Sequence, residues 1–321
     1  MSFKTIWKTG ALFALLGLQL SAHAAPLVIA IAEFPLFAPM QIADSEGYFK
    51  AEGLDVRIQP CVNGRRCLKH LTDGEAQVAA VADTPLVFAV HAGLPFEIIA
   101  TTSVGARDTM LVARTDRGIL SVQDLKGKRV GTFGGTTAHF FISNLLLVAG
   151  LPRDSVTVVM MDPERGFEPL LKGEVDAASL YRPLGPLAVQ QLGAKVRALD
   201  VPRAFTSSSN LVAQPGLPQD TLLRLLKAVA RATALMNNSP AQARQVLAAR
   251  WKQDAQQVDK QLSGYEFRLT LDQNLLLTLE AESRWALRDG LVNPNSSADF
   301  LSRLRVEPLR TLNPQAVSII K

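Results

Sequence analysis

The stretch Lys128-Arg-Val-Gly-Thr-Phe-Gly-Gly-Thr-Thr-Ala-His-Phe-Phe-Ile-Ser-Asn-Leu-Leu-Leu-Val-Ala-Gly150 contains a β-rich run, a glycine pair and a helical pattern, in that order. The β-rich run covers 129–133 and breaks at Gly134 and Gly135. From position 140 to 148, apolar residues recur near a period of 3.6, which predicts an amphipathic helix. The stretch therefore has the order of a strand, a tight turn and a helix.

The start of this predicted helix is suited to an anion. Thr136 or Thr137 can cap the helix, and Gly150 can end it. A strand, a glycine break and a capped helix start leave several backbone N–H groups directed at one point, which favours a bound anion. The same pattern also fits an ordinary turn between a strand and a helix of an α/β sheet.

The first 24 residues have the pattern of an export signal. Lys4 and Lys8 precede an apolar run at 11–20, and Ala22-His-Ala24 forms an A-x-A cleavage site. The run is too short for a permanent membrane-spanning helix, and no cysteine follows it for a lipid anchor. We therefore expect an exported protein that is cleaved after Ala24.

Length and composition indicate a globular protein of about two domains. The chain has 321 residues, of which 48% are hydrophobic and 20% charged. Without the leader, Lys and Arg fall from 34 to 32 against 29 Asp and Glu, so the net charge is near +3. Because this charge is weak and scattered, and Tyr and Trp number three each, we expect no nucleic-acid partner. The balance fits a small anionic ligand or no particular partner.

The only two cysteines, Cys61 and Cys67, flank a turn in Pro60-Cys-Val-Asn-Gly-Arg-Arg-Cys67. In an exported chain, a close pair of this kind favours a disulfide. A metal site would need more ligands, and the only histidine nearby is His70. We predict a disulfide, and neither a metal nor a cofactor.

Strands and helices are predicted to alternate through most of the chain. In the first half, strands are expected at 27–34, 54–59, 77–82 and 96–103, and helices at 40–50, 65–71 and 84–91. A second series has strands at 129–133, 156–161, 176–181 and 195–199, and helices at 137–149, 164–171 and 183–192. This alternation favours mainly parallel sheets with helices on both faces.

The chain is expected to divide into two lobes. Two further extended runs, 109–113 and 207–213, join the two series, and a purely helical C-terminal third follows with helices at 220–236, 240–251, 255–262 and 272–287. We predict one lobe from 25–107 and 208–321 and a second from 108–207. The two crossovers between them would act as a hinge.

Four stretches, taken in order, resemble one family. They are Phe37-Ala-Pro-Met-Gln-Ile-Ala-Asp-Ser-Glu-Gly-Tyr-Phe-Lys-Ala-Glu-Gly-Leu-Asp-Val56, Asp73-Gly-Glu-Ala-Gln-Val-Ala-Ala80, Asp124-Leu-Lys-Gly-Lys-Arg-Val-Gly131 and Leu171-Lys-Gly-Glu-Val-Asp-Ala177. They are similar to periplasmic substrate-binding proteins of ABC importers, in the branch for nitrate, taurine, alkanesulfonates and the thiamine-precursor pyrimidine. The resemblance implies a two-lobed α/β fold of the periplasmic-binding-protein type II, with ligand held between the lobes and no catalysis. It also implies a monomer in the periplasm that delivers its ligand to an inner-membrane permease with its ATPase.

The resemblance implies four places that line the ligand pocket. Carried over by position, they contain Phe34, Pro35 and Phe37; Asp83, Thr84 and Pro85; Gly135, Thr136, Thr137 and His139; and Tyr181, Arg182 and Pro183. The last place differs from the Trp-x-Pro that is usual in sulfonate binders. Independently of the resemblance, each place follows a predicted strand, and ligands of open α/β sheets bind beyond the carboxyl ends of strands.

Several of these residues have a structural alternative. Arg182 would offer a planar fork to a sulfonate or carboxylate, or would pair at the surface with Asp162 or Glu164. Phe34 and Phe37 would stack on the ligand or belong to the core.

The remaining candidates have similar alternatives. His139 would contact the ligand or pack locally, and Asp83 would bind a ligand amine or cap the helix that begins at Thr84. Thr136 and Thr137 would bind the ligand or serve only as caps.

The sequence contains none of the common catalytic motifs. G-x-S-x-G, H-E-x-x-H and a P-loop are absent, and neither cysteine is placed as a nucleophile. The leading hypothesis is the one that the resemblance implies, a binding protein for a small organic anion of the sulfonate, taurine or nitrate type. Two alternatives are a binder of the thiamine-precursor pyrimidine and a periplasmic partner that presents ligand to a membrane sensor.

Overall fold

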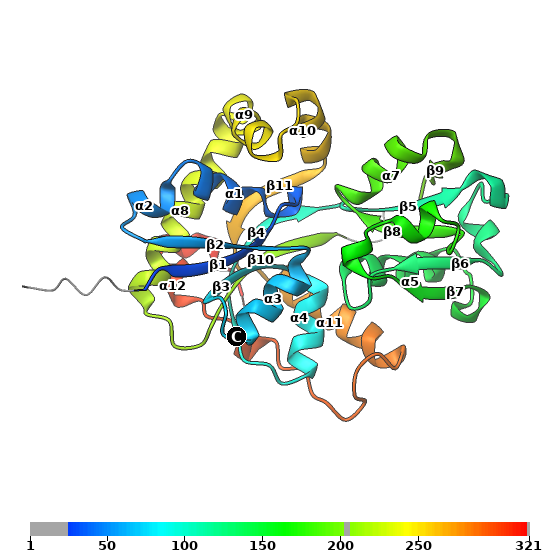
Figure 1. Ribbon diagram of the computed structural model, residues 1–321. Coiled ribbons are helices and arrows are strands. Elements are labelled where there is room, and N and C mark those ends of the chain that lie inside the picture. Colours follow the sequence, from blue (N-terminus) through cyan, green and yellow to red (C-terminus); the bar gives the residue numbers. More distant parts are fainter. Residues whose placement is uncertain (1–24, 202–205, 320–321) are drawn as a thin grey trace, which may run out of the picture.

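The computed structural model describes residues 25–201 and 206–319, so the predicted export signal at 1–24 lies outside the described residues. Two bodies lie side by side, each built on its own β-sheet (Figure 1). We call the body on the six-stranded sheet lobe 1 and the body on the five-stranded sheet lobe 2. The fold is the two-lobed α/β arrangement that the sequence predicts.

The strands of lobe 1 are β1 (Leu27–Ala32), β2 (Val56–Cys61), β3 (Val78–Ala82), β4 (Glu97–Gly105), β10 (Ser207–Ala213) and β11 (Tyr265–Thr270). Those of lobe 2 are β5 (Thr109–Arg114), β6 (Arg129–Thr132), β7 (Thr157–Met160), β8 (Ala177–Tyr181) and β9 (Val196–Ala198).

The helices before the second crossover are α1 (Ala38–Ser45), α2 (Tyr48–Ala51), α3 (Gly64–Thr72), α4 (Asp83–His91), α5 (Thr137–Val148), α6 (Glu168–Leu171) and α7 (Leu184–Leu192). Those after it are α8 (Gln219–Asn238), α9 (Pro240–Trp251), α10 (Ala255–Leu262), α11 (Gln273–Arg288) and α12 (Glu307–Leu312). Short 3₁₀ turns join several of these elements, among them η1 (Pro35–Phe37), which follows β1.

Both sheets are mixed, not mainly parallel as the sequence predicts. Parallel pairs join β1 to β2 and β3, and β6 to β7 and β8, and each sheet also contains a crossover strand that runs the other way. In lobe 1 the strand order is β11-β4-β10-β3-β1-β2, and β10 is antiparallel to both β3 and β4. In lobe 2 the order is β7-β6-β8-β5-β9, and β5 is antiparallel to β8 and β9. Because β5 enters lobe 2 and β10 returns from it, both crossovers lie near the middle of the molecule. Whether the lobes move as units divided at 107/108 and 207/208 stays a prediction.

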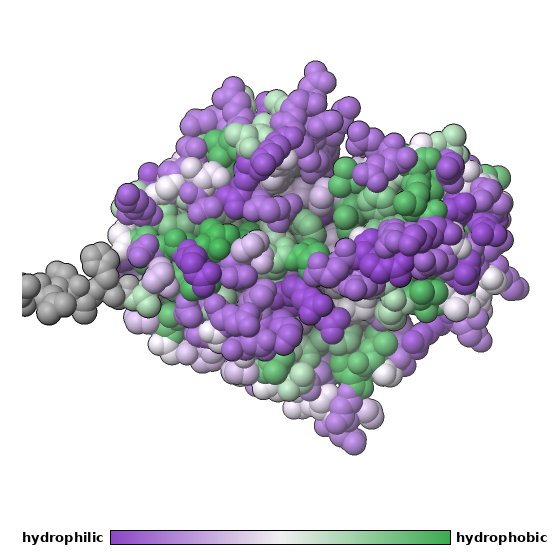
Figure 2. Space-filling view, viewed as in Figure 1, coloured by the Kyte–Doolittle hydropathy of each residue, from purple (hydrophilic) through white to green (hydrophobic). Residues whose placement is uncertain are grey.

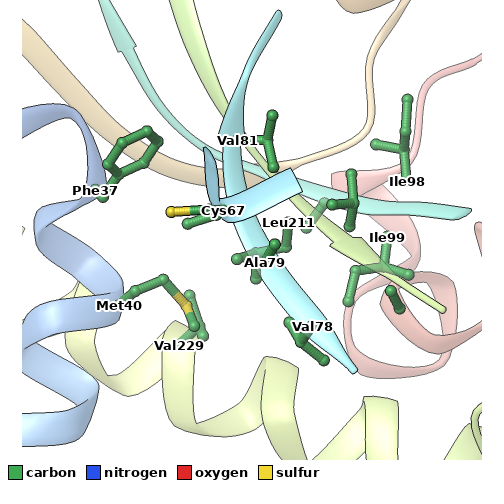
Figure 3. Close-up of a cluster of buried hydrophobic side chains, with 14 of the residues drawn as sticks. Phe37, Met40, Cys67, Val78, Ala79, Val81, Ile98, Ile99, Leu211 and Val229 are labelled. Carbon is green, nitrogen blue, oxygen red and sulfur yellow. The ribbon is translucent and has the colours of Figure 1, made fainter. Parts of the chain in front are cut away.

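The core of lobe 1 surrounds its central strands. Every residue of β3 is buried, as expected for a strand covered by helices on both faces. Figure 3 shows Val78, Ala79 and Val81 of this strand among side chains of neighbouring elements, with Met40 and Val229 coming from α1 and α8. This packing fixes the positions where β1 and β3 end, and those ends face the second lobe.

Three predictions about local structure were wrong. The helix expected at 164–171 is divided, because Gly166 has a positive φ (54°) between the 3₁₀ turn η5 (Pro163–Arg165) and α6. The helix expected at 40–50 is broken in two, because Gly47 adopts a left-handed conformation (φ 67°) between α1 and α2. The C-terminal third is mostly helical but not purely so, because β11 pairs with β4 at the edge of the first sheet.

The face seen in Figure 2 is mostly hydrophilic, with hydrophobic side chains gathered in smaller areas on both lobes. Within the described ranges, no helix combines the length and the apolar character needed to cross a membrane.

Candidate functional site

A small cavity of about 30 Å³ lies where the two lobes meet, with space for about two water molecules. It has walls from η1 and the starts of α3 and α4 in lobe 1, from the start of α5 and the end of β8 in lobe 2, and from the first crossover. We call this space the central cavity. It shares Asn63, Arg65 and Thr136 with an outer groove of about 870 Å³ that opens beside α3 and α4.

The lobes touch on several sides of the central cavity. Arg65 of lobe 1 donates a hydrogen bond to the carbonyl of Gly134 in lobe 2, with 2.7 Å between Nη1 and O. Asn63 Nδ2 lies 3.4 Å from the hydroxyl of Tyr181, which is on β8. The rings of Phe34 and Tyr181 pack with their centroids 5.0 Å apart. The molecule is therefore closed around this cavity, and a ligand larger than water needs the lobes to separate before it can enter.

The start of α5 has the geometry that its sequence predicts. Gly135 has φ 65°, which favours glycine, and it lies next to the guanidinium of Arg65. Thr136 occupies the N-cap position, but its hydroxyl donates to the carbonyl of Phe133 at 2.7 Å instead of accepting from the helix. Consequently, the N–H groups of Thr137 and Ala138 have no hydrogen-bond acceptor among the described residues.

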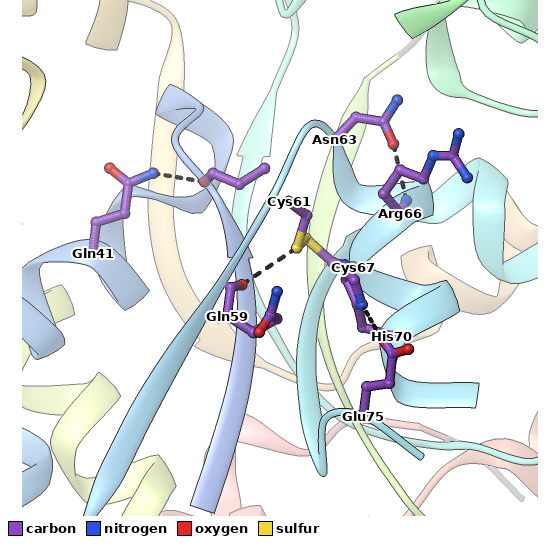
Figure 4. The surroundings of a disulfide bond; sticks show 9 residues. Gln41, Gln59, Cys61, Asn63, Arg66, Cys67, His70 and Glu75 are labelled. Atoms are coloured by element: carbon purple, nitrogen blue, oxygen red, sulfur yellow. Dashed lines mark hydrogen bonds and ion pairs between the residues drawn. A yellow bond between two sulfur atoms is a disulfide. The ribbon is translucent and has the colours of Figure 1, made fainter. Parts of the chain in front are cut away.

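A second helix start reaches the cavity from lobe 1, and the disulfide holds it. Cys61 ends β2 and Cys67 lies in α3, and the two are bonded, as predicted (Figure 4). The Asn63 side chain caps α3 by accepting from the N–H of Arg66 at 2.9 Å.

Gly64, the residue after the cap, has little room for a side chain. A Cβ on Gly64 would lie 3.1 Å from the Phe37 ring and 3.2 Å from the Ala82 nitrogen. The close approach of α3 to β3 therefore depends on this position. The N–H groups of Gly64 and Arg65 find no acceptor in the described part of the chain.

The predicted aromatic residues meet at the cavity in different ways. Phe37 is 1% exposed and belongs mainly to the core, with only its ring edge at the wall. Phe34 is half-buried and packs between Phe37 and Tyr181. Burial raises the pKa of the Tyr181 hydroxyl, so it stays protonated and able to donate. These rings form the apolar part of the cavity wall.

Asp83 and Thr84 lie beside the cavity rather than in it. The Asp83 carboxylate accepts from the Thr84 N–H at 3.0 Å, and from the Ser208 N–H and hydroxyl at 2.7 and 3.2 Å. It thereby joins the start of α4 to the returning crossover strand β10. Burial raises the pKa of Asp83 to about 7. Ala82 is the N-cap of α4, so the capping role expected for Asp83 is replaced by this tie across the sheet.

His139 faces away from the cavity, as its packing alternative predicts. Its ring lies edge-on to Trp285 of α11 at 5.1 Å, and its Nδ1 accepts a long hydrogen bond from the Gly135 N–H. Burial lowers the pKa of His139 to about 4, so the ring is neutral at physiological pH. It contributes to contact between the lobes and not to the cavity wall.

Arg182 does not face the central cavity, nor does it pair with Asp162 or Glu164. Its Nη1 donates to the carbonyls of Gln261 and Ser263, each at 2.8 Å, at the C-terminal end of α10. Helix carbonyls at a C-terminus attract cations, which explains this orientation. The guanidinium therefore lines a separate groove on the hinge side.

Asp108 lines the central cavity and was not predicted. It lies between β4 and β5 on the first crossover and is 4% exposed. Its Oδ1 accepts a short hydrogen bond from the hydroxyl of Tyr265 on β11. Burial raises the pKa of Asp108 to about 6, although the Tyr265 hydroxyl and the charge of Arg182 act in the opposite direction.

The central cavity thus has a polar end and an aromatic wall. Two helix starts, one from each lobe, supply N–H groups for an anion, and Arg65 lies beside them. Over the described ranges, no cluster of three or more His, Cys, Asp or Glu could hold a metal ion. The arrangement is suited to binding a small polar molecule.

Comparison with known sequences identifies related binding proteins. A family model described as NMT1/THI5 like matches residues 35–243. A "Putative aliphatic sulfonates-binding protein" of Bacillus subtilis is 26% identical over 163 residues, which are 50% of this chain and 49% of that protein. A putative binding protein of Brucella abortus is 29% identical over 143 residues, 44% of this chain and 43% of that protein. The matched region thus spans less than half the length of these curated relatives.

Comparison with solved structures shows the same fold over nearly the whole chain. The alkanesulfonate-binding protein SsuA from Xanthomonas axonopodis pv. citri, bound to MOPS, superposes with a TM-score of 0.75 at 16% identity. That match covers 89% of this chain and 100% of SsuA. The periplasmic aliphatic sulphonate binding protein SsuA from Escherichia coli gives 0.72 at 19% identity, with coverages of 87% and 96%.

Proposed function

The chain belongs to the NMT1/THI5-like family, and on that premise we propose that it captures a small sulfonate-type anion and delivers it to an ABC importer. The observation that carries the proposal is the meeting of two helix N-termini, from opposite lobes, at one closed cavity. The relatives that are described as sulfonate-binding proteins support the choice of head group.

The anion would be held mainly by backbone groups. Gly64 and Arg65 offer N–H groups from α3, and Thr137 and Ala138 offer them from α5. A sulfonate has three oxygens, so it can accept from both helices at once. Because each lobe supplies only part of this set, the site is complete only when the lobes close, and ligand binding would favour closure.

Two side chains complete the anion site. Thr137 lines the cavity, so its hydroxyl can donate to the ligand. Arg65 takes the place that the sequence suggested for Arg182, since its guanidinium already bridges the lobes at Gly134. When a ligand binds, this arginine can donate to a sulfonate oxygen in place of the Gly134 carbonyl, so the hydrogen bond between the lobes would be replaced by one to the ligand.

The expected energies are sufficient for micromolar affinity. Such affinity requires about −8 kcal/mol. A helix N-terminus contributes roughly 0.3–2 kcal/mol to a nearby anion, and each charge-assisted hydrogen bond about 1.5–3 kcal/mol. At the upper ends of these ranges, two helix starts and three such bonds give about 13 kcal/mol, to which apolar burial against Phe34 adds. That sum reaches the required value when the cost of association is near its low end of about 4 kcal/mol.

Delivery to a permease is also part of the proposal. The leader pattern at 1–24 supports export to the periplasm, and the described part of the chain contains no membrane-spanning helix. Because the site is complete only when the lobes close around ligand, the open ligand-free form and the closed ligand-bound form differ in shape. A permease can distinguish these two forms. The permease and ATPase would form the membrane part of the importer.

A ligand screen tests the proposed function. The mature protein would be titrated with taurine, alkanesulfonates, nitrate and a hydroxymethylpyrimidine, with thermal unfolding as the readout. A ligand at a hundred times its Kd stabilises the fold by about 2.7 kcal/mol, a shift of several degrees. We expect sulfonates to give this shift. Stabilisation by the pyrimidine alone would contradict the anion site.

A matched pair of threonine variants locates the site. Thr137→Val removes a hydroxyl from the cavity, and we expect roughly ten-fold weaker sulfonate binding. Thr84→Val removes a buried hydroxyl from the start of the neighbouring helix α4, outside the cavity, and should leave affinity unchanged. Equal effects of the two variants would show that the anion does not lie at α5.

A further inference from the structure

A tryptophan of lobe 1 contacts the helix of lobe 2 that starts at the anion site. Trp285 lies on α11, at the side of lobe 1 that faces lobe 2 (Figure 1), and it is 3% exposed. The ring centroids of His139 and Phe140 lie 5.1 and 5.2 Å from that of Trp285, and both pairs pack edge to face. Since His139 and Phe140 belong to α5 and none of the three residues lines the central cavity, this is a separate contact between the lobes.

Ring packing alone makes this contact. Phe88 of α4 holds the indole from within lobe 1, with the two ring centroids 6.0 Å apart. Phe140 is half-buried and packs against the hydrophobic core of lobe 1, although its helix belongs to lobe 2. The Trp285 Nε1 has no hydrogen-bond acceptor among the described residues, so the favourable terms are edge-to-face packing and apolar burial. Separation of the lobes would therefore expose both Trp285 and Phe140.

A polar contact on the next turn of α11 reinforces the first. Arg153 lies in the 3₁₀ turn η4 (Arg153–Ser155), which follows α5. Its Nη1 donates to the carbonyl of Asp289 at 3.0 Å, and its Nε lies 3.8 Å from the Asp289 carboxylate. Asp289 comes one turn after Trp285, at the C-cap of α11. Two successive turns of α11 therefore hold α5 and the segment after it against lobe 1.

The contact with Trp285 involves the same helical turn as the proposed anion donors. Thr137 and Ala138, which offer their N–H groups to the anion, directly precede His139 in the first turn of α5. His139 also accepts the long hydrogen bond from the Gly135 N–H, so it links the indole ring to the chain before the helix. A shift of this turn relative to lobe 1 would change the distance between the starts of α3 and α5.

We propose that Trp285 is a positioning residue for the anion site, because it holds the first turn of α5 where one anion can accept from both helix starts. This inference rests on the proposed function, because it takes the anion site as given. The contact joins the lobes only when they are closed, so it stabilises the ligand-bound form. The affinity then depends on a residue outside the cavity, since the apparent Kd rises as the fraction of closed protein falls.

The fluorescence of Trp285 tests whether this contact forms on closure. The sequence has two tryptophans after position 24, so Trp251→Phe in the mature protein leaves Trp285 as the only one. Trp251 lies on α9 and donates to Gln41 within lobe 1, outside the central cavity. We expect ethanesulfonate to move the emission to shorter wavelength and to reduce quenching by acrylamide, because closure removes the indole from water. Unchanged emission at a concentration that saturates a calorimetric titration would overturn the inference.

Calorimetric titration of variants tests the positioning role. Trp285→Leu should weaken ethanesulfonate binding by about ten-fold, while Trp285→Phe keeps an aromatic ring and should retain most of the affinity. Phe140→Ala removes the same contact from the side of lobe 2 and should give a similar loss. The double variant should lose little more than either single variant, because two partners in one contact are not additive. The control Trp251→Leu should lower the Tm but leave the affinity unchanged.

The possible results separate this inference from the proposed function. If the wild type does not bind ethanesulfonate or taurine, the proposed function fails and this inference fails with it. If the wild type binds and the folded Trp285→Leu and Phe140→Ala variants keep full affinity, only the positioning role is overturned. Strictly additive losses in the double variant, or an equal loss in Trp251→Leu, would also overturn it, since both results indicate general destabilisation instead of one contact.

Discussion

The disulfide should stabilise both the fold and the ligand site, and reduction of this one bond tests that. Cys61 and Cys67 are six positions apart, and Cys67 is fully buried. For a loop of this size, the chain-entropy relation gives roughly 2 kcal/mol at 25 °C. For a protein of about 300 residues, that corresponds to about 3 °C in Tm.

The loop inside the disulfide carries part of the site. Asn63, Gly64 and Arg65 lie between the two cysteines, and all three line the central cavity. Once the bond is reduced, the loop must be ordered at the moment of binding, and fixing a residue costs roughly 1–2 kcal/mol. Three residues that are only partly freed would weaken sulfonate binding by about ten-fold or more.

The assay compares unfolding and ligand titration with and without a reductant. The matched control is the Cys61→Ala, Cys67→Ala double variant, in which the reductant has nothing to act on. We expect the reductant to lower the Tm and the affinity of the wild type and to leave both unchanged in the variant. If a thiol titration shows two free thiols while Tm and affinity stay constant, the disulfide does not support the site.

Three further predictions concern the lobe contacts and the buried titratable groups. Arg65→Ala should weaken sulfonate binding by about ten-fold. The control Arg66→Ala removes a neighbouring guanidinium that does not line the central cavity, so it should leave the affinity unchanged. Equal losses of affinity in the two variants would indicate general charge attraction instead of a contact with the ligand. His139→Phe keeps the packing on Trp285 but cannot titrate. The pKa of His139 is about 4 in the folded state and 6.5 in the unfolded state, so the unfolded state takes up a proton first as the pH falls. The free energy of unfolding of the wild type should therefore fall, relative to that of the variant, by roughly 3 kcal/mol between pH 6.5 and pH 4. A difference that stays constant with pH in urea titrations would refute this. Glu282 is fully buried and its carboxyl oxygens have no hydrogen-bond partner in the described residues. Burial raises the pKa of Glu282, so the folded state keeps a proton that the unfolded state loses above pH 4.5. The free energy of unfolding of Glu282→Gln should therefore rise relative to that of the wild type as the pH rises from 5 to 8. A difference that does not change with pH would show that Glu282 is not protonated in the folded state.

Much of the fold could be predicted because its signals are local. The glycine break before α5 and the apolar periods of the helices are visible in the sequence, and they appear in the structure where expected. The strand β11 was missed although Tyr265, Phe267 and Leu269 alternate with polar residues, which is a strand pattern. Its position among helices favoured the wrong interpretation.

The site was harder to predict because distant residues orient its side chains. Arg182 has a local setting that is compatible with a pocket, but carbonyls about eighty positions later determine its direction. Asp108 is oriented by Tyr265, which is 157 positions away, so no local pattern identifies it. Asn63 and Arg65 did have a signal, since an Asn-Gly pair precedes the apolar pattern of α3, but the cysteines on either side suggested only a structural turn.

The most direct test of the account is a crystal structure of the mature protein grown with taurine. The account predicts the sulfonate in the central cavity, within hydrogen-bonding distance of the N–H groups of Gly64 and Thr137 and of the guanidinium of Arg65. Two results would contradict the central claim that two helix starts from opposite lobes form the anion site. One is a ligand bound in the outer groove or in the groove lined by Arg182, and the other is a sulfonate that contacts only one lobe.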